Sequence, residues 1–526
     1  MKKYTQFNHK AKIKKMQLSF SFDLTNHFHV DDEVFLVHNI VEEMNLSFLK
    51  NAYQNIGRKP VVEPSNMLKI LVFAYMNRIY SSRDIEDACK YDLRFKWLLN
   101  SSKSPSYVTI NRFRNKIHPF LDKIFIEFVN LLIDYGEIDL KSIYVDGTKI
   151  ESNANKYTFV WKKSILKYQD RLIKKINEHF KIDKKLDSKE CIKFLKNKFN
   201  KIRNTCKKEN LIFVYGQGRR KSQLQKDYEL YEEWLDKLNT YEKHLEIMGE
   251  RNSYSRTDHD ATFMRMKEDH MRNGQLKPAY NIQCATNGGY VIGIESFSKP
   301  SDMTTLIPFL DKINKAYDKK IHRLVADSGY ESEENYMFLK ENNIESFIKP
   351  QNYEQKKKRK YKNDISKKEN MKYLEDEDSY VCANGRKLEY AYTATRKNTN
   401  EYKSEYKVYE SSDCNGCKLS DDCMKYKNKD NLKRLYVSSN FEKLRNESEL
   451  NINSVEGKEE LVNRSIQAEG VFSYIKSGMK YNRFSHRGKS NIVSELKILS
   501  LAINIRKLSS KLKNNRDEFT RYKISV

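Results

Sequence analysis

The apolar and polar positions in the middle of this chain predict alternating strands and helices. Residues 143–145 form a short apolar run that leads into Asp146 and Gly147, and residues 324–326 form a second run that ends at Asp327. Short runs of β-branched and aromatic residues bounded by turn residues are typical of buried strands. We therefore expect two strands, each of which delivers a carboxylate close to a glycine.

The segment between and after these two strands completes a sheet. Residues 280–286 and 290–295 are apolar runs on either side of Asn-Gly-Gly, which predicts a β-hairpin. A helical pattern over residues 302–317 precedes Asp327, and a further helix and a strand at residues 344–348 follow it. This order predicts a mixed α/β sheet with flanking helices, in which three antiparallel strands are followed by right-handed helical crossovers.

Helical patterns dominate the amino-terminal part of the chain. Residues 65–80 are rich in helix formers, with Ser65 or Asn66 placed to cap the helix, and residues 82–89 start another. After a turn, residues 109–116 predict a short basic helix. Small helices followed by a basic helix suit docking in the major groove of DNA, although a helical bundle with a solvated basic face fits the same pattern.

A long charged segment after the first strand predicts a helical arm. Apolar residues recur there at spacings of four, three, four, three and seven, which is typical of a short coiled-coil seam. They are Leu224, Tyr228, Tyr231, Leu235, Leu238 and Leu245. We expect a helical hairpin between about residues 161 and 248, with Gly216 and Gly218 near a connection. Packing among its own helices explains the pattern, and a clamp on DNA or a second subunit is the alternative.

The helix expected around Glu469 combines an acid with a cation. Ala468 begins a run of apolar residues at spacings of three, four and four, which places Glu469 at the edge of a buried face. Lys476 lies two turns on, on the same side. A carboxylate and a cation on one helix edge suit a site that holds a metal and a phosphate, whereas a surface ion pair on a core helix is the simpler interpretation.

Composition changes this picture mainly through charge. The 526 residues are enough for several structural units, and the formal net charge of +27 indicates an anionic polymer as partner. No stretch is long and apolar enough to predict a membrane span, so we expect a cytoplasmic protein without a membrane partner. Because Lys, Asn, Ile and Tyr are abundant, AT-rich coding also accounts for part of the charge. Only local clusters of basic residues therefore indicate a binding site for an anionic partner.

The carboxyl-terminal segment shows such clustering. Residues 471–526 contain 13 Lys and Arg against 3 Asp and Glu, well above the average of the chain. Within it, Arg483 and Arg487 alternate with aromatic residues close to the Glu469 helix. In the amino-terminal part, Arg112 and Arg114 are the cations of the short basic helix. We expect the first pair to contact phosphates and the second pair to read bases.

Two further clusters have the composition of metal sites. Cys382, Cys414, Cys417 and Cys423 gather half of the eight cysteines of the chain, and Cys414-x-x-Cys417 has the spacing of a structural zinc site. Free thiols and a redox pair remain alternatives. Residues 255–261 contain two Asp and one His, which suits a metal ligand set and also an ordinary turn.

The three separated acids have a chemical interpretation of their own. Burying a lone Asp in a strand costs several kcal/mol unless it is paired or holds a cation. Asp146, Asp327 and Glu469 are therefore predicted to converge on one site. Oxygen ligands favour Mg²⁺ or Mn²⁺ there over zinc.

Together these blocks resemble a known family. Val145-Asp146-Gly147-Thr148-Lys149, Ala326-Asp327-Ser328-Gly329-Tyr330 and Arg464-x4-Glu469-x6-Lys476 are similar to the three motif blocks of DDE transposases from bacterial insertion sequences. Residues 109–114 and 255–261 also resemble segments of these proteins. One departure is that related transposases place a Tyr and an Arg six and three or four residues before the Glu. Here position 463 is Asn, and Arg464 stands five residues before Glu469.

The resemblance implies a fold and an activity. It implies an RNase H-like core, a catalytic triad of Asp146, Asp327 and Glu469 that holds two Mg²⁺ or Mn²⁺ ions, and Arg464 and Lys476 as basic residues beside the glutamate. The expected partners are the terminal inverted repeats of the element and target DNA, bound by a homo-oligomer in the bacterial nucleoid. The alternatives are a non-catalytic DNA-binding protein derived from a decayed or repurposed transposase, and a coiled-coil scaffold.

The same patterns divide the chain into units. We expect an amino-terminal helical DNA-binding domain at residues 1–135 and a catalytic core at residues 136–350, interrupted by a helical or coiled-coil insertion at residues 156–250. A small cysteine-containing insertion follows at residues 351–455. The glutamate helix and the basic carboxyl-terminal region occupy residues 456–526.

Overall fold

The computed structural model describes most of the chain. The described residues are 25, 28–52, 60–184, 186–216, 220–266, 274–398, 400–424 and 430–513. Within these ranges no helix is long and apolar enough to cross a membrane.

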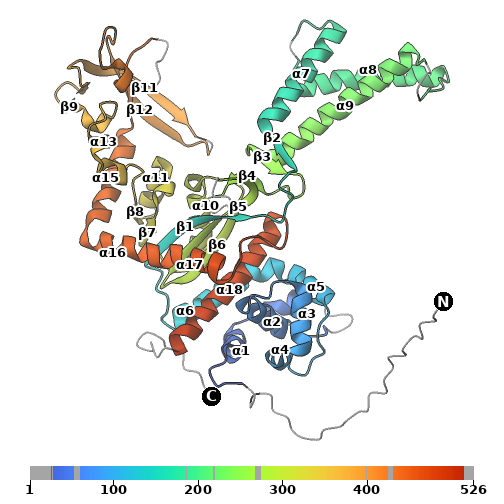
Figure 1. The fold of residues 1–526 in the computed structure, drawn as a ribbon, viewed down its shortest axis with the longest axis vertical. Helices are drawn as coiled ribbons and strands as arrows, with labels where there is room; N and C mark the ends of the chain where they lie inside the picture. Colours follow the sequence, from blue (N-terminus) through green and yellow to red (C-terminus); the bar gives the residue numbers. More distant parts are fainter. Residues whose placement is uncertain are drawn as a thin grey trace, which may run out of the picture.

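A six-stranded mixed sheet lies at the centre of the molecule (Figure 1). Its strands are β1 (Ser142–Glu151), β4 (Thr262–Arg265), β5 (Leu276–Asn287), β6 (Tyr290–Phe297), β7 (Arg323–Ala326) and β8 (Glu345–Ile348). Strand β5 pairs antiparallel with β1, β4 and β6, whereas β7 pairs parallel with β1 and with β8. The predicted hairpin and the mixed α/β sheet are confirmed, and β7 ends just before Asp327 as predicted. Strand β1 is longer than predicted, because it continues past Asp146 and Gly147 as far as Glu151.

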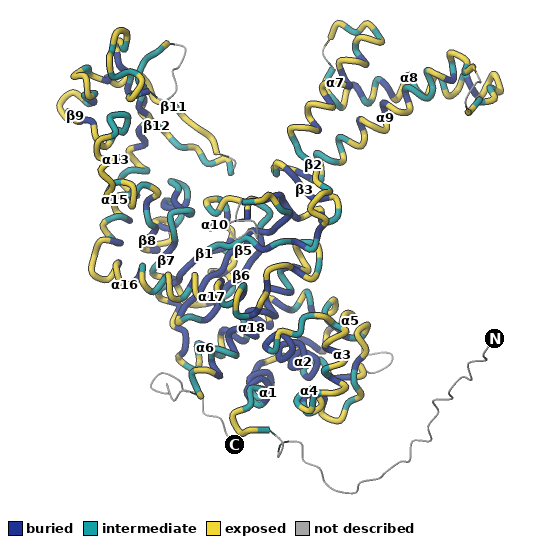
Figure 2. Tube along the Cα trace, viewed as in Figure 1, coloured by how far each residue is buried: buried dark blue, intermediate teal, exposed yellow. Residues whose placement is uncertain are grey.

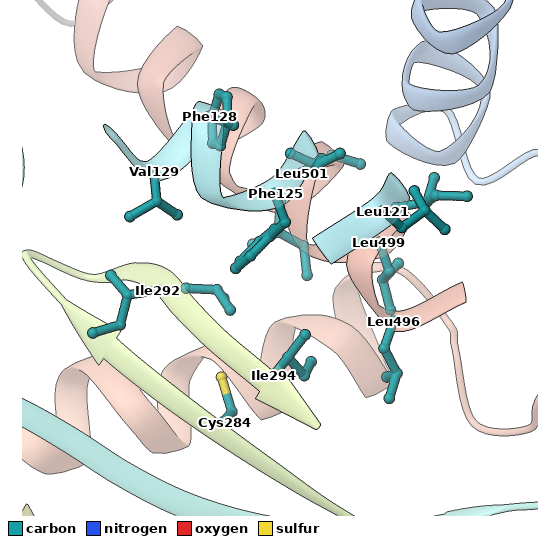
Figure 3. Close-up of a cluster of buried hydrophobic side chains, with 14 of the residues drawn as sticks. Leu121, Phe125, Phe128, Val129, Cys284, Ile292, Ile294, Leu496, Leu499 and Leu501 are labelled. Atoms are coloured by element: carbon teal, nitrogen blue, oxygen red, sulfur yellow. The ribbon is translucent and has the colours of Figure 1, made fainter. Parts of the chain in front are cut away.

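Helices cover both faces of this sheet. Figure 3 shows Ile292 and Ile294 of β6 directed toward Phe125 of α6 (Leu121–Asp134) and Leu496 of α18 (Lys489–Lys513). Gly293, between those two isoleucines, points to the opposite face, where a Cβ atom would lie 3.0 Å from Ile313 of α10 (Leu306–Ala316). Because successive residues of β6 point to opposite faces of the sheet, this strand packs against helices on both faces.

In the described residues, five α-helices precede α6, and they share one hydrophobic core with the sheet. They are α1 (Glu33–Glu43), α2 (Pro64–Met76), α3 (Ser82–Tyr91), α4 (Leu93–Leu98) and α5 (Tyr107–Ile117). Helix α2 is buried along nearly its whole length and packs against α18. The predicted cap at Ser65 or Asn66 is wrong, because α2 begins one residue earlier at Pro64, whose fixed φ and missing N–H suit a first helical position.

The predicted arm is present as three helices rather than a simple hairpin. Helices α7 (Lys162–Phe180), α8 (Ser188–Lys208) and α9 (Gln223–Met248) project away from the sheet and rise from a two-stranded base of β2 (Phe159–Trp161) and β3 (Ser253–Ser255) (Figure 1). They pack around their own small core, which includes Tyr231, Leu235 and Leu238 of the predicted seam. Outside this core, most residues of the arm are exposed or partly exposed (Figure 2). Gly216 lies in the connection between α8 and α9, and Gly218 lies outside the described residues.

A second, antiparallel sheet is inserted in the chain between β8 and the helices that carry Glu469. Its strands run in the order β13-β12-β11-β10-β9. They are β9 (Lys372–Leu374), β10 (Ser379–Val381), β11 (Lys387–Lys397), β12 (Lys403–Ser411) and β13 (Arg434–Val437). Helix α15 (Ser439–Asn453) then returns the chain to β8, and α16 (Val455–Arg464) follows it.

The turn at residues 255–261 ties three of these parts together. Asp258 is almost fully buried and accepts hydrogen bonds from Ser152 Oγ (2.5 Å), Tyr280 Oη (2.9 Å to Oδ1) and the Gly488 N–H (3.2 Å). These donors come from the end of β1, from β5 and from the residue before α18. The structure therefore uses this acid as a turn residue and a hydrogen-bond centre, consistent with the turn interpretation of the stretch.

Asp258→Ala should destabilise the protein, because it leaves the buried hydroxyls of Ser152 and Tyr280 without an acceptor. We expect a decrease of about 2–4 kcal/mol in the free energy of unfolding, seen as a lower midpoint in thermal melts. Asp260→Ala is the matched control, since that side chain is exposed and accepts the N–H of the exposed Lys489. Equal melting shifts for the two variants would contradict the role assigned to Asp258.

Candidate active site

Asp146 lies in the central strand β1, directly opposite Cys284 of β5. Burial raises the pKa of the Asp146 carboxyl to about 6, and the negative charges of Asp327 and Glu469 act in the same direction. The Gly147 N–H, 2.9 Å from Oδ1, and the Arg464 guanidinium oppose this shift in pKa. The three predicted acids therefore interact electrostatically across elements far apart in the sequence.

Asp327 follows the last residue of β7 and sits beside Asp146 by register. Val145 of β1 pairs with Ala326 of β7 in the parallel ladder, so the next residue on each strand is an acid. The Asp327 carboxylate accepts a hydrogen bond from the Gly329 N–H at 2.8 Å and caps a short 3₁₀ turn, Ser328–Tyr330. This is the carboxyl end of a strand in an open α/β sheet, where ligands usually bind.

Glu469 stands on a helix that differs from the predicted regular one. After α16, residues Ser465–Glu469 form a π-helical turn, α17 (Gly470–Ser473) follows, and Tyr474–Gly478 form a second π turn. Arg464 Nη2 lies 2.6 Å from Glu469 Oε1 across the first π turn. The arginine side chain is only 15% exposed, whereas that of Glu469 is 52% exposed. Lys476 is half-buried on the second π turn.

These acids have the donor chemistry of a magnesium site, but they do not form a ligand set in this structure. Nowhere in the described ranges are three or more His, Cys, Asp or Glu side chains arranged to hold a metal ion. Asp146 and Asp327 are adjacent on neighbouring strands, while the Glu469 carboxylate is engaged by Arg464. Oxygen ligands of this kind suit Mg²⁺ or Mn²⁺, so the residues present fit such an ion chemically.

A fourth carboxylate, that of Asp302, lies close to Gly147 and Gly329, beside Asp146 and Asp327. The sequence patterns did not single it out. Asp302 Oδ1 accepts hydrogen bonds from Asn281 Nδ2 at 2.7 Å and Gln283 Nε2 at 2.9 Å. A Cβ atom on Gly147 would lie 2.9 Å from Asp302 Oδ1 and 2.6 Å from Gln283 Nε2, so glycine is required there. In the sequence, Asp302 is an ordinary acid at the start of a helical pattern. Only the fold brings it next to the strand of Asp146.

The arginines predicted to contact DNA differ in their exposure and in their hydrogen-bond partners. Arg483 and Arg487 are exposed, but their guanidinium groups donate to the backbone carbonyls of residues 152–154 after β1. Arg114 donates to the Tyr80 carbonyl at 3.0 Å and is half-buried in the helical bundle, whereas Arg112 of the same helix is exposed. The structure thus brings the first pair next to the strand of Asp146 and separates Arg112 from Arg114.

The four clustered cysteines line one small cavity of about 20 Å³. Cys382 follows β10, whereas Cys414 and Cys417 lie in the turn after β12 and Cys423 ends a helical turn. Burial raises the pKa of the Cys423 thiol, and the other three cysteines add to this shift while Lys433 opposes it. A cavity of this size has room for one water-sized particle, so four thiol donors around it fit a single ion. Their arrangement in the structure is nevertheless not that of a coordination shell.

Two segments of the chain, one toward each terminus, match known protein families. Residues 22–116 match the family model described as Transposase domain (DUF772), and residues 381–509 match the model described as Transposase DDE domain. The first segment contains helices α1 to α5, and the second contains the cysteine cluster and Glu469. No curated protein and no solved structure was found to match the chain.

The two matched segments, which together cover less than half of the chain, indicate a transposase. With the DDE domain at the carboxyl-terminal side, they indicate a DDE transposase of an insertion element, as the motif blocks predicted. Asp146 and Asp327 lie outside both matched segments, so their assignment depends on the motif blocks and on the sheet register.

Asp146→Asn should stabilise the metal-free protein in a pH-dependent way. Since the pKa of a folded Asp146 lies near 6 and that of an unfolded Asp near 4, the protonated form favours folding, and this stabilisation is lost as the pH rises through 6. The variant does not undergo this change and should be more stable than the original protein by about 1–3 kcal/mol at pH 7.5, with little difference at pH 4.5. Denaturant unfolding in a chelator at both pH values measures this. A difference that did not depend on pH would contradict the effect of burial on Asp146.

Proposed function

We propose that this transposase binds the ends of its element and catalyses metal-dependent DNA cleavage and strand transfer, with Asp146, Asp327 and Glu469 as the catalytic acids. The observation that carries the proposal is the adjacency of Asp146 and Asp327 on parallel strands, together with the influence of Glu469 on the Asp146 pKa. In the proposed reaction these three acids, from two strands and a helix, would act together at one site for DNA phosphoryl transfer.

The strand order supports an RNase H-like core. Strands β6, β5 and β1 are antiparallel neighbours, and β7 and β8 continue the sheet parallel to β1. The helical arm enters between β1 and β5, and the cysteine-containing sheet enters between β8 and α16. We therefore interpret both as insertions into one catalytic core.

Each residue has a distinct role in the proposed reaction. Asp146, Asp327 and Glu469 would hold Mg²⁺ or Mn²⁺, which supplies charge stabilisation to the phosphate and a more acidic nucleophile, either water or a 3′-hydroxyl. Arg464 orients the Glu469 carboxylate through their 2.6 Å contact and lowers the cost of ionising Asp146. Lys476 would contact the phosphate of the DNA from the same helix.

Single neutral substitutions at the triad should abolish cleavage while DNA binding is retained. Asp146→Asn, Asp327→Asn and Glu469→Gln each remove one charged oxygen donor, so nicking of DNA that contains the element ends should fall below detection with Mg²⁺ present. Asp318→Asn, at an exposed acid after α10, is the control that should cleave normally. Cleavage by any triad variant would remove that residue from the site.

Metal binding by the original protein and by these variants can be measured separately from DNA cleavage. Mg²⁺ or Mn²⁺ should raise the thermal midpoint of the original protein and of Asp318→Asn, because a ligand that binds only the folded state stabilises it. The three triad variants should show a smaller rise or none. If the original protein bound DNA but neither cleaved it nor responded to metal, the repurposed DNA-binding protein would be the better description.

The remaining DNA contacts are assigned by exposure. Arg112 projects from α5 of the segment that matches a transposase domain, so we propose that it contributes to recognition of the terminal repeats. Arg114 would support this helix from within the bundle through its contact with the Tyr80 carbonyl. Arg483 and Arg487 hold the exit of β1 and would present phosphate contacts beside the catalytic strand. A homo-oligomer on two element ends is the expected assembly.

We further propose a structural zinc ion among the four cysteines, because one small cavity collects all four thiols. Purified protein should then contain about one zinc per chain. Cys414→Ser combined with Cys417→Ser should remove it, whereas Cys206→Ser, at a buried cysteine of the arm, should retain it. Elemental analysis that found no zinc in the original protein, with the four thiols reacting freely in the native state, would favour plain cysteines.

A further inference from the structure

Helix α8 of the arm is strongly basic, and its neighbour α9 is acidic. Eight of the 21 residues of α8 are Lys or Arg and one is Glu, whereas α9 carries three Lys against seven Asp and Glu in 26 residues. An AT-rich coding sequence would enrich Lys in both helices alike, so base composition does not explain this contrast.

Five of the cations form a single stripe along α8. They are Lys189, Lys193, Lys196, Arg203 and Lys207. Their spacings of four, three, seven and four residues keep them on one face of a helix with 3.6 residues per turn, and all five are exposed. By the rise of an α-helix the stripe is about 27 Å long. The apolar residues of α8, among them Cys191 and Leu195, point instead into the core of the arm.

The cations of the stripe are not used inside the arm. A basic helix beside an acidic one is most simply explained by ion pairs between them. In the described part of the arm, however, none of the five cations forms an ion pair, and three acids of α9 have other partners: Glu242 with Gln169 and Ser188, Glu229 with Lys221, and Glu233 with Lys237. The positive stripe is therefore left for a partner outside the chain.

We propose that this face of α8 binds the phosphate backbone of duplex DNA, so that the arm holds DNA at a distance from the catalytic acids. A straight row of cations suits a regularly charged polymer, because each cation can neutralise one phosphate and release its counterions. The base of the arm, β2 and β3, follows the carboxyl end of β1, the strand that carries Asp146 in its middle. The proposed function enters only through the choice of DNA as the partner.

Backbone contacts of this kind carry no base preference, so α8 would add affinity for any sequence. The separation between the arm and the sheet also means that α8 would hold substrate without touching the reacting atoms (Figure 1). Removing the stripe should consequently weaken binding to duplex DNA of any sequence.

The test compares two triple variants of the full chain that remove the same amount of charge. Lys193→Gln, Lys196→Gln and Arg203→Gln remove the centre of the stripe, and Lys226→Gln, Lys237→Gln and Lys243→Gln remove the three cations of α9 in the same arm. Binding to a duplex of about 40 base pairs without element ends, long enough to span the stripe at about 3.4 Å per base pair, would be followed by fluorescence anisotropy at several salt concentrations. Glutamine preserves helix propensity, and circular dichroism would confirm that both arms are folded.

The α8 variant should bind about 10-fold more weakly near 0.1 M salt, and the slope of log affinity against log salt should fall by roughly 0.9 for each phosphate that the helix no longer neutralises. The α9 variant should behave like the original protein. Equal weakening in both variants would show a general charge effect and overturn the proposal. Unchanged DNA binding by a folded α8 variant would also overturn it, and a changed oligomeric state in that case would assign the face to protein contact. Because no cleavage is required, an inactive triad would not affect the outcome.

Discussion

The structure depends on a carboxylate held in the middle of a buried strand. Asp146 lies in β1, the strand that joins the antiparallel and parallel halves of the central sheet, and its environment raises its pKa through burial and through two other acids. Such a group costs folding free energy unless a cation compensates it. Protein groups supply part of that compensation, since the Gly147 N–H and Arg464 both favour the charged form. An unfavourable carboxylate of this kind is typical of sites that are built for a ligand.

The glutamate helix illustrates how backbone geometry accommodates an unusual spacing. Arg464 stands five residues before Glu469, one or two more than in the transposases that the chain resembles. The π turn at Ser465–Glu469 contains an extra residue per turn, and across it the arginine still reaches the carboxylate at 2.6 Å. The position of the cation relative to the acid is therefore kept by the helix type and not by the residue spacing.

The arm and the site are mechanically connected through the end of β1. Asp258 receives hydrogen bonds from Ser152, Tyr280 and the Gly488 N–H, while Arg483 and Arg487 hold the carbonyls of residues 152–154. The chain leaves β1 at this point to build α7, α8 and α9. Hydrogen bonds therefore fasten the start of the arm to β5 and to the start of α18.

The sequence by itself determined the strand that carries Asp146, the strand that leads to Asp327, the hairpin, and the helical character of the arm and of the Glu469 segment, because each depends on local periodicity and turn residues. The π turns around Glu469 and the third helix of the arm were not predicted. Charge clustering and the ordered motif blocks also indicated the transposase class. Only the tertiary structure decided the roles that need distant partners. It placed Asp302 beneath Gly147, buried Asp258 among donors from three elements, and enclosed Arg114 in a bundle that shares its core with the sheet. It also set the basic face of α8 beside an acidic helix with which, in the described residues, that face forms no ion pair. Long-range contacts of this kind leave no periodic trace in the sequence, since the partners are separated by tens to hundreds of residues.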